Sequence, residues 1–168
     1  MRQALHQCLL ETEWDAFEDL ITLLLAIMGF MEIEVSSRSK DGGNDVCGTL
    51  VVGDVILTRM AIQVKKWKHN VRAPVTQRVP GSLGTHGQGL IITTGGFRVG
   101  AREESVRPDA TPVGLMSGEQ LILLLIESDI RPSRRSHDSL ELEDISSTEV
   151  SISASVAGSQ LNDKGQVW

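Results

Sequence analysis

Residues 14–28 carry apolar side chains at helical spacing. Positions 14, 17, 20, 21, 24, 25 and 28 fall on one face of a helix with 3.6 residues per turn. Acidic residues lie in the first turns, where the helix dipole favours negative charge. Gly29 follows as a C-terminal stop. The pattern predicts an amphipathic helix over residues 14–28.

Three strands are predicted after this helix, over residues 31–35, 44–52 and 55–67. Alternation in the first strand places Ile33 and Val35 on one face, and a loop over residues 36–43 follows it. Gly53 and Asp54 separate the other two strands and can turn the chain. We therefore expect the second and third strands to form a β-hairpin.

Helices and strands alternate in the second half of the chain. The apolar runs predict, in order, a helix over 74–84, a buried strand over 88–94, a helix over 98–106, a strand over 112–116 and a helix capped by Ser117 that reaches Ile126. Pro80 lies inside the first of these helices, so we expect a break at Val79 or a different boundary. The whole order predicts an α/β fold, with helices flanking a mixed β-sheet.

The character of the sequence changes near Arg131. RPSRRSHDS is a polar linker, LELEDI predicts one more strand, and residues 147–168 are rich in serine with little apolar patterning. We expect a catalytic domain over 14–130, an N-terminal extension over 1–13, and a linker with a flexible tail over 131–168.

Composition also bears on the cellular compartment of the protein. The two cysteines, Cys8 and Cys47, form no spaced cluster, so neither a disulfide framework nor a cysteine zinc site is expected. No apolar run reaches the roughly 18 residues that a membrane span needs, and no signal peptide is visible. We expect a reduced, cytoplasmic protein.

Charge is distributed unevenly along the chain. The net charge is −6 overall, yet residues 55–102 hold eight basic and no acidic side chains, while the segments on either side carry a net −7 each. An acid-free basic segment inside an acidic chain indicates contact with phosphates. Chance clustering on a solvated face explains the same pattern about equally well.

The candidate chemistry lies on the third predicted strand. Alternation puts Gln63 and Lys65 on one face and Ile62 and Val64 on the other. Asp45 falls opposite Ile62 if the hairpin loop has two residues, and opposite Gln63 if the loop has one more residue or a bulge. An ordinary solvated face is the alternative explanation.

A carboxylate, an amide oxygen and a backbone carbonyl are hard oxygen ligands that suit Mg²⁺. Asp45, Gln63 and Val64 offer these three donors, and Lys65 beside them can orient or deprotonate a water molecule. Glu18, on the first predicted helix, can add a carboxylate through water. The spacing thus favours a magnesium site for phosphoryl chemistry.

Polar residues beyond this strand are candidates for DNA contact. They are Lys66, Lys68, His69 and Arg72. Contacts from them to phosphates would weaken with salt and carry no sequence information; a solvated strand end is the alternative. The turn over residues 93–96 (TTGG) can present backbone N–H groups to a phosphate, or it is a glycine turn and nothing more.

Six motifs in order resemble the Mrr-type restriction endonuclease family, a branch of the PD-(D/E)xK nuclease superfamily. They are FE at 17–18, MGF at 28–30, RSKDGGNDV at 38–46, IQVKKW at 62–67, LIITTGGF at 90–97 and LMSGEQLILLL at 115–125. The resemblance spans roughly residues 14–130 and implies a restriction-endonuclease-like mixed sheet and magnesium-dependent hydrolysis of DNA.

Carried over by position, Asp45 is the metal-binding aspartate and Lys65 the motif lysine. Gln63 replaces the acidic residue of the superfamily motif, and Glu18 matches the helix glutamate. Family members commonly act on methylated DNA through an added reading domain. Only 13 residues precede the first predicted helix, so a complete winged-helix reader is not expected here.

The leading hypothesis is a magnesium-dependent DNA endonuclease of the restriction type. One active site cuts one strand, so cleavage of both strands favours a homodimer. A repair or junction-cleaving nuclease is a second reading that keeps the chemistry. A DNA-binding module without catalysis is a third, and it has no need of Asp45, Gln63 and Lys65 together.

Overall fold

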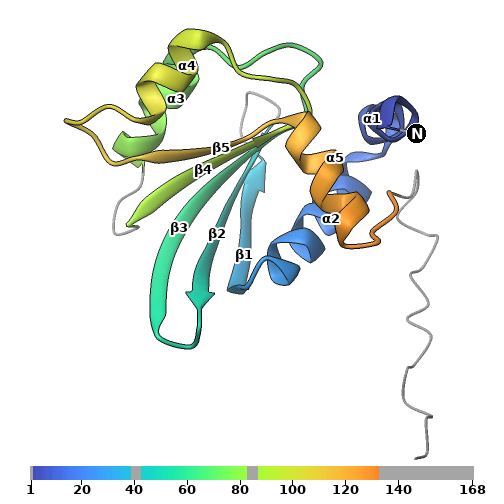
Figure 1. The fold of residues 1–168 in the computed structure, drawn as a ribbon, viewed down its shortest axis with the longest axis horizontal. Helices are drawn as coiled ribbons and strands as arrows, with labels where there is room; N and C mark the ends of the chain where they lie inside the picture. Colours follow the sequence, from blue (N-terminus) through green and yellow to red (C-terminus); the bar gives the residue numbers. More distant parts are fainter. Residues whose placement is uncertain (1, 39–42, 83–86, 133–168) are drawn as a thin grey trace, which may run out of the picture. The chain divides into compact units, whose positions relative to one another are not determined.

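The structure is a computed structural model, and it describes residues 2–38, 43–82 and 87–132 (Figure 1). The elements in chain order are α1 (Arg2–Glu11), α2 (Trp14–Ile27), β1 (Phe30–Arg38), β2 (Gly43–Val52), β3 (Ile56–Lys65), α3 (Ala73–Ser82), β4 (Gln88–Thr93), α4 (Val99–Ser105), β5 (Val113–Met116) and α5 (Gly118–Glu127). The predicted LELEDI strand, the serine-rich tail and most of the linker lie outside the described residues.

The five strands form one sheet in the order β1-β2-β3-β4-β5. The first three strands pair antiparallel, and β3, β4 and β5 pair parallel. Each parallel connection carries a helix, as a crossover between parallel strands requires. The predicted mixed sheet with flanking helices is therefore confirmed.

The β2–β3 hairpin has a three-residue loop. Val52 pairs with Ile56, and Asp45 pairs with Gln63. Gly53 and Asp54 both have positive φ, at 59° and 57°, which glycine and aspartate tolerate better than most residues. The register expected from a two-residue loop is wrong, and the register expected from one extra loop residue is confirmed.

Each face of the sheet has its own apolar core, and α1, α2 and α5 lie on one side of the sheet while α3 and α4 lie on the other (Figure 1). Ile62 and Val64 of β3 are buried against the α1, α2 and α5 side, which we call the α2 face. Ala61 packs against the opposite core, on what we call the α3 face. The sheet therefore separates two differently lined surfaces.

Helix α1 was not expected from the sequence. Leu9 is fully buried in the core on the α2 face, and Leu5 packs against that core. The helix also contacts α5. The segment expected to be an extension therefore contributes to the core of the domain.

Two local patterns differ from expectation. Helix α3 continues through Pro80 to Ser82, so the break at Val79 is wrong; the other alternative, a different boundary, is met at the start, since the helix begins at Ala73. Pro80 lies near the helix end, where its missing N–H removes only the bond to the carbonyl four residues earlier. In β1, irregular register flanks the segment 34–35, and Val35 is 39% exposed while Ile33 packs on the core. Strict alternation over this strand is therefore lost.

The helices predicted at 14–28, 98–106 and 117–126 are confirmed as α2, α4 and α5. Ser117 caps α5, and its side chain accepts a hydrogen bond from the Gln120 N–H in a capping box. Within the described ranges, every helix is too short or too polar to cross a membrane.

Candidate active site

The register of the hairpin brings three predicted site residues together. Asp45 and Gln63 are direct cross-strand partners, and Lys65 lies two residues beyond Gln63 on the same strand. Direct partners and residues two apart share one face of a sheet. All three side chains therefore leave the sheet on the α3 face, near the C-terminal end of β3.

Burial increases along this row. Asp45 is exposed, Gln63 is half-buried, and Lys65 is only 5% exposed. The Lys65 Nζ lies 5.1 Å from the centroid of the Trp67 ring. Among the described residues, the Lys65 ammonium makes no hydrogen bond and no ion pair. A buried cation without an acidic partner is costly unless an anion or water completes it.

The next residue along the chain, Lys66, is on the α2 face. Its ammonium donates a hydrogen bond to the Thr12 carbonyl and lies 5.9 Å from the Phe17 ring centroid. Burial lowers the pKa of the Lys66 ammonium below its ordinary value. The chain itself uses this cation to join β3 to the α1–α2 junction, and a contact from Lys66 to phosphate stays a prediction.

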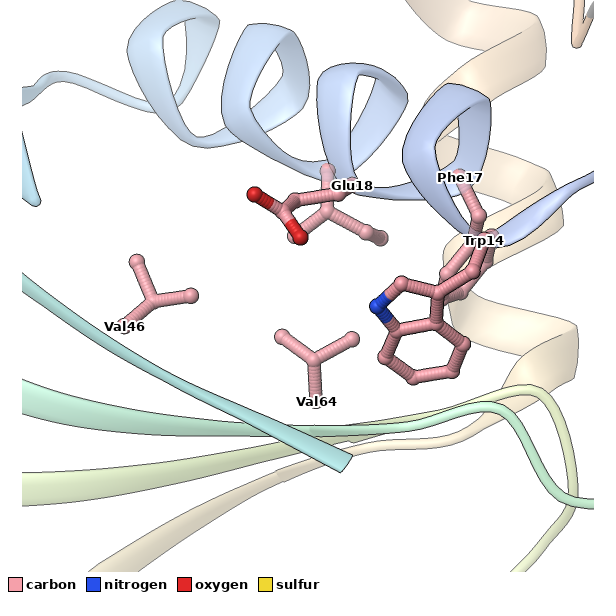
Figure 2. Close-up of a pocket in the computed structure, with 6 residues that line it drawn as sticks. Trp14, Phe17, Glu18, Val46 and Val64 are labelled. Carbon is pink, nitrogen blue, oxygen red and sulfur yellow. The ribbon is translucent and has the colours of Figure 1, made fainter. Parts of the chain in front are cut away.

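Glu18 also lies on the α2 face. It lines a small cavity between α2 and the sheet together with Val46 and Val64. In Figure 2 the carboxylate projects from α2 toward the strands, above these two valines. The cavity of about 10 Å³ is near the lower limit for one water molecule. The structure does not bring Glu18 to the face that holds Asp45, Gln63 and Lys65, and its part in catalysis stays a prediction.

The donor set on the α3 face fits Mg²⁺. Asp45 is an exposed carboxylate directly opposite the amide of Gln63, and directly paired residues have Cβ atoms about 5 Å apart. Within the described part of the chain, no three His, Cys, Asp or Glu side chains gather as a metal site. A site with one carboxylate, one amide and several waters suits an ion that gives up its water reluctantly.

The other predicted DNA-contacting residues lie just after β3. His69 stacks on Trp67, with ring centroids 4.7 Å apart and planes at 21°. Lys68 and Arg72 are exposed. The ring of Trp67 therefore contacts both Lys65 and His69. Lys68 and Arg72 extend a cationic surface beyond the candidate active site.

The turn over residues 93–96 uses its backbone N–H groups within the chain. The Thr94 N–H donates to the Lys65 carbonyl, the Gly95 N–H to the Thr93 hydroxyl, and the Gly96 N–H to the Asn70 side chain. The expectation that these groups bind phosphate is therefore wrong. A Cβ on Gly95 would lie 2.3 Å from the His69 carbonyl oxygen, so this close approach requires glycine.

Comparisons with known proteins found a family model, a similar sequence and a similar structure. A sequence model of the restriction endonuclease family Mrr_cat matches residues 9–125, which is more than half of the chain. The Type IV methyl-directed restriction enzyme EcoKMrr of Escherichia coli (strain K12) is 28% identical over 133 residues, which cover 76% of this chain. The family model covers the end of α1 and every candidate residue on the α3 face.

A solved structure shares the fold. The DNA modification-dependent restriction endonuclease AspBHI superposes with a TM-score of 0.61 at 21% sequence identity, over 77% of this chain. The chain spans 42% of the length of EcoKMrr and 36% of the AspBHI chain. The similarity therefore concerns one part of each of these larger proteins.

Proposed function

The chain belongs to the Mrr_cat restriction endonuclease family, and we propose that it is a magnesium-dependent DNA endonuclease that hydrolyses phosphodiester bonds. The observation that carries this proposal is Lys65: a cation only 5% exposed, without an acidic partner among the described residues, beside Asp45 and Gln63. An anionic substrate supplies the partner that the chain itself does not.

Asp45, Gln63 and the Val64 carbonyl would hold the metal. The side chains of Asp45 and Gln63 offer two oxygens from paired positions, and Val64 is the residue between Gln63 and Lys65. Bound Mg²⁺ supplies charge stabilisation for the attacking and leaving oxygens of an in-line displacement. Since Gln63 is neutral, the site has one negative charge fewer than a site with two carboxylates.

Lys65 acts on the attacking water and on the phosphate. Its ammonium, held beside the Trp67 ring, donates hydrogen bonds that orient the water and steady the charge that develops on the non-bridging oxygens. The water oxygen bonds to phosphorus as the bond from phosphorus to the 3′ oxygen breaks. The attacking water releases a proton to solvent, and the leaving 3′ oxygen takes one up, so the products are a 5′-phosphate and a 3′-hydroxyl.

We propose modified DNA as the substrate class, with double-strand cleavage by a pair of subunits. The names of EcoKMrr and AspBHI describe methyl-directed and modification-dependent restriction, which supports this class. One active site breaks one strand, so two copies would be needed at a double-strand break. Nicked plasmid should then precede linear plasmid, and linear product should grow with protein concentration.

Plasmid cleavage tests the proposal. Methylated and unmethylated plasmids are incubated with the wild type and with Lys65→Ala, in Mg²⁺ or in EDTA. We expect nicking that needs Mg²⁺, is strongest on methylated DNA and is lost in Lys65→Ala. A wild type that binds DNA and cleaves no substrate under any of these conditions would leave a DNA-binding module as the function.

A further inference from the structure

A second site lies at the C-terminal edge of the parallel strands. A pocket of about 600 Å³ opens there, between α1, α4, the start of α5 and the segments that follow β3 and β4. We call it the edge pocket; its polar lining includes Arg2, His6, Lys68, Asn70 and Arg102. Its volume is in the range of pockets that hold small molecules or groups.

Three cations reach the edge pocket from three separate elements. Arg2 belongs to α1, Lys68 follows β3, and Arg102 belongs to α4. None of the three forms an ion pair with any described residue. Glu119 is the one acidic side chain among the described residues that line the pocket. Three like charges around one pocket that form no ion pair repel one another, and a bound anion relieves that repulsion.

The walls of the edge pocket are held in place by contacts that involve no acidic side chain. The His6 Nε2 donates to the Thr94 carbonyl at 2.7 Å, which ties α1 to the end of β4. The Asn70 side chain accepts from the Gly96 N–H at 3.2 Å. The Arg102 guanidinium lies 5.9 Å from the Phe97 ring centroid. These contacts position the lining without neutralising its charge.

The edge pocket adjoins the end of β3, which carries the candidate active site. Thr94 lines the pocket, its N–H donates to the Lys65 carbonyl, and its hydroxyl donates to the Trp67 carbonyl. Lys68 is three residues from Lys65, which limits their Cα separation to about 11 Å. A nucleic-acid strand cleaved beside Lys65 can therefore place a neighbouring phosphate at Lys68.

We propose that the edge pocket binds phosphate groups through Arg2, Lys68 and Arg102. The inference rests on the proposed nuclease function for its preferred source of phosphate, the backbone of the DNA strand. A free phosphate compound offers the same chemistry and is the other source. Arginine and lysine recognise phosphate by charge-assisted hydrogen bonds, which explains why three such residues share one pocket.

DNA binding at several salt concentrations tests the first source. Affinity for a short duplex is measured by fluorescence anisotropy in EDTA, so that no cleavage intervenes. Each phosphate contact contributes about 0.9 to the slope of log affinity against log salt. In the triple variant Arg2→Gln, Lys68→Gln, Arg102→Gln we expect the magnitude of this slope to fall by about 2 to 3. The matched control Arg59→Gln removes one exposed cation at the far end of β3 and should change the slope by less than 0.5 on the same scale.

Calorimetry with inorganic phosphate and with a nucleoside triphosphate tests the second source. Binding that the wild type shows and the triple variant lacks, with an unchanged DNA slope, supports the pocket and assigns it to free phosphate compounds. If the triple variant and Arg59→Gln are alike toward DNA, inorganic phosphate and the triphosphate, the proposal is overturned.

The variant Glu119→Gln keeps the proposal testable if the triple variant folds poorly. It removes the acidic side chain of the lining, so DNA affinity should rise about two- to fivefold, a gain that damage to the fold does not produce. An unchanged or lower affinity in Glu119→Gln counts against the proposal. If the wild type does not cleave DNA, the proposed nuclease function is wrong, and these binding results still stand. Failure of the nuclease function and failure of the phosphate site are therefore distinguishable.

Discussion

Lys65 and Lys66 are neighbours in the chain and differ in almost every contact. Lys66 points to the α2 face, where the Thr12 carbonyl and the Phe17 ring enclose its ammonium. Lys65 points to the α3 face and is more deeply buried; its ammonium lies beside the Trp67 ring and makes no hydrogen bond or ion pair with a described residue. The protein supplies an acceptor for the Lys66 ammonium, and we propose that a ligand supplies one for the Lys65 ammonium.

The same division holds for the carboxylates. Glu18 lies above Val46 and Val64 on the α2 face, while Asp45 is exposed on the α3 face opposite Gln63 (Figure 2). Changes on the α2 face should therefore alter the stability of the domain, and changes on the α3 face should alter its activity. Four substitutions test this separation, from the largest expected effect to the smallest.

Asp45→Asn should remove almost all cleavage. The exposed carboxylate is the single negative ligand proposed for Mg²⁺, so we expect the single-turnover rate to fall at least about 10³-fold, or roughly 4 kcal/mol. The free energy of unfolding should change by less than about 0.5 kcal/mol, because Asp45 is exposed. Asp54→Asn, in the loop of the same hairpin, is the matched control; equal losses in both variants would contradict the assignment.

Lys66→Met should lower stability instead. The substitution keeps the aliphatic stem of the side chain but removes the donor to the Thr12 carbonyl. Thr12 is only 1% exposed. We expect a loss of about 1 to 2 kcal/mol in urea unfolding, since charged hydrogen bonds contribute at this level. A variant as stable as the wild type would show that the Thr12 contact does not hold the α1–α2 junction.

Gln63→Glu should lower the magnesium requirement. The new carboxylate would face Asp45 and add a second negative ligand, so we expect half-maximal cleavage at about tenfold less Mg²⁺, which corresponds to about 1.4 kcal/mol. Gln88→Glu, at the start of β4, adds the same charge away from the site and serves as control. An unchanged requirement in Gln63→Glu would remove Gln63 from the proposed ligands.

Glu18→Gln should have the smallest effect. Its carboxylate lies on the α2 face, with the sheet between it and the proposed metal, so its influence is a distant charge effect and we expect the magnesium requirement to rise less than about threefold. Magnesium titration of the cleavage rate measures it. A rise of tenfold or more would show that Glu18 reaches the metal and that the two faces are not separate.

Local patterns were enough to predict most elements. The apolar spacing of α2, the alternation of β3 and the Ser117 cap of α5 are all set by neighbours in the chain, and the structure has each of them. The spacing of Leu5 and Leu9 also fits a helix, so α1 was within reach of the same reasoning. Alternation likewise places Lys66 on the face opposite Lys65, and the prediction of Lys66 as a DNA contact did not use it.

Other features depend on contacts that the sequence does not display. One residue in the hairpin loop decides whether Asp45 faces Ile62 or Gln63, and a glycine-aspartate pair permits either length. The N–H groups of residues 93–96 are used by partners up to 29 residues away, such as Lys65. The edge pocket combines residues from α1, α4 and α5, which are distant along the chain.

The most direct test of this account compares Lys65→Met with Lys66→Met in one experiment. Single-turnover cleavage and urea unfolding are measured for both variants under identical conditions. We expect Lys65→Met to lose cleavage by about 10³-fold or more and to keep its stability. We expect Lys66→Met to keep cleavage within about threefold and to lose stability. Equal loss of cleavage in the two variants, or full cleavage by Lys65→Met, would contradict the claim that the α3 face is the active site.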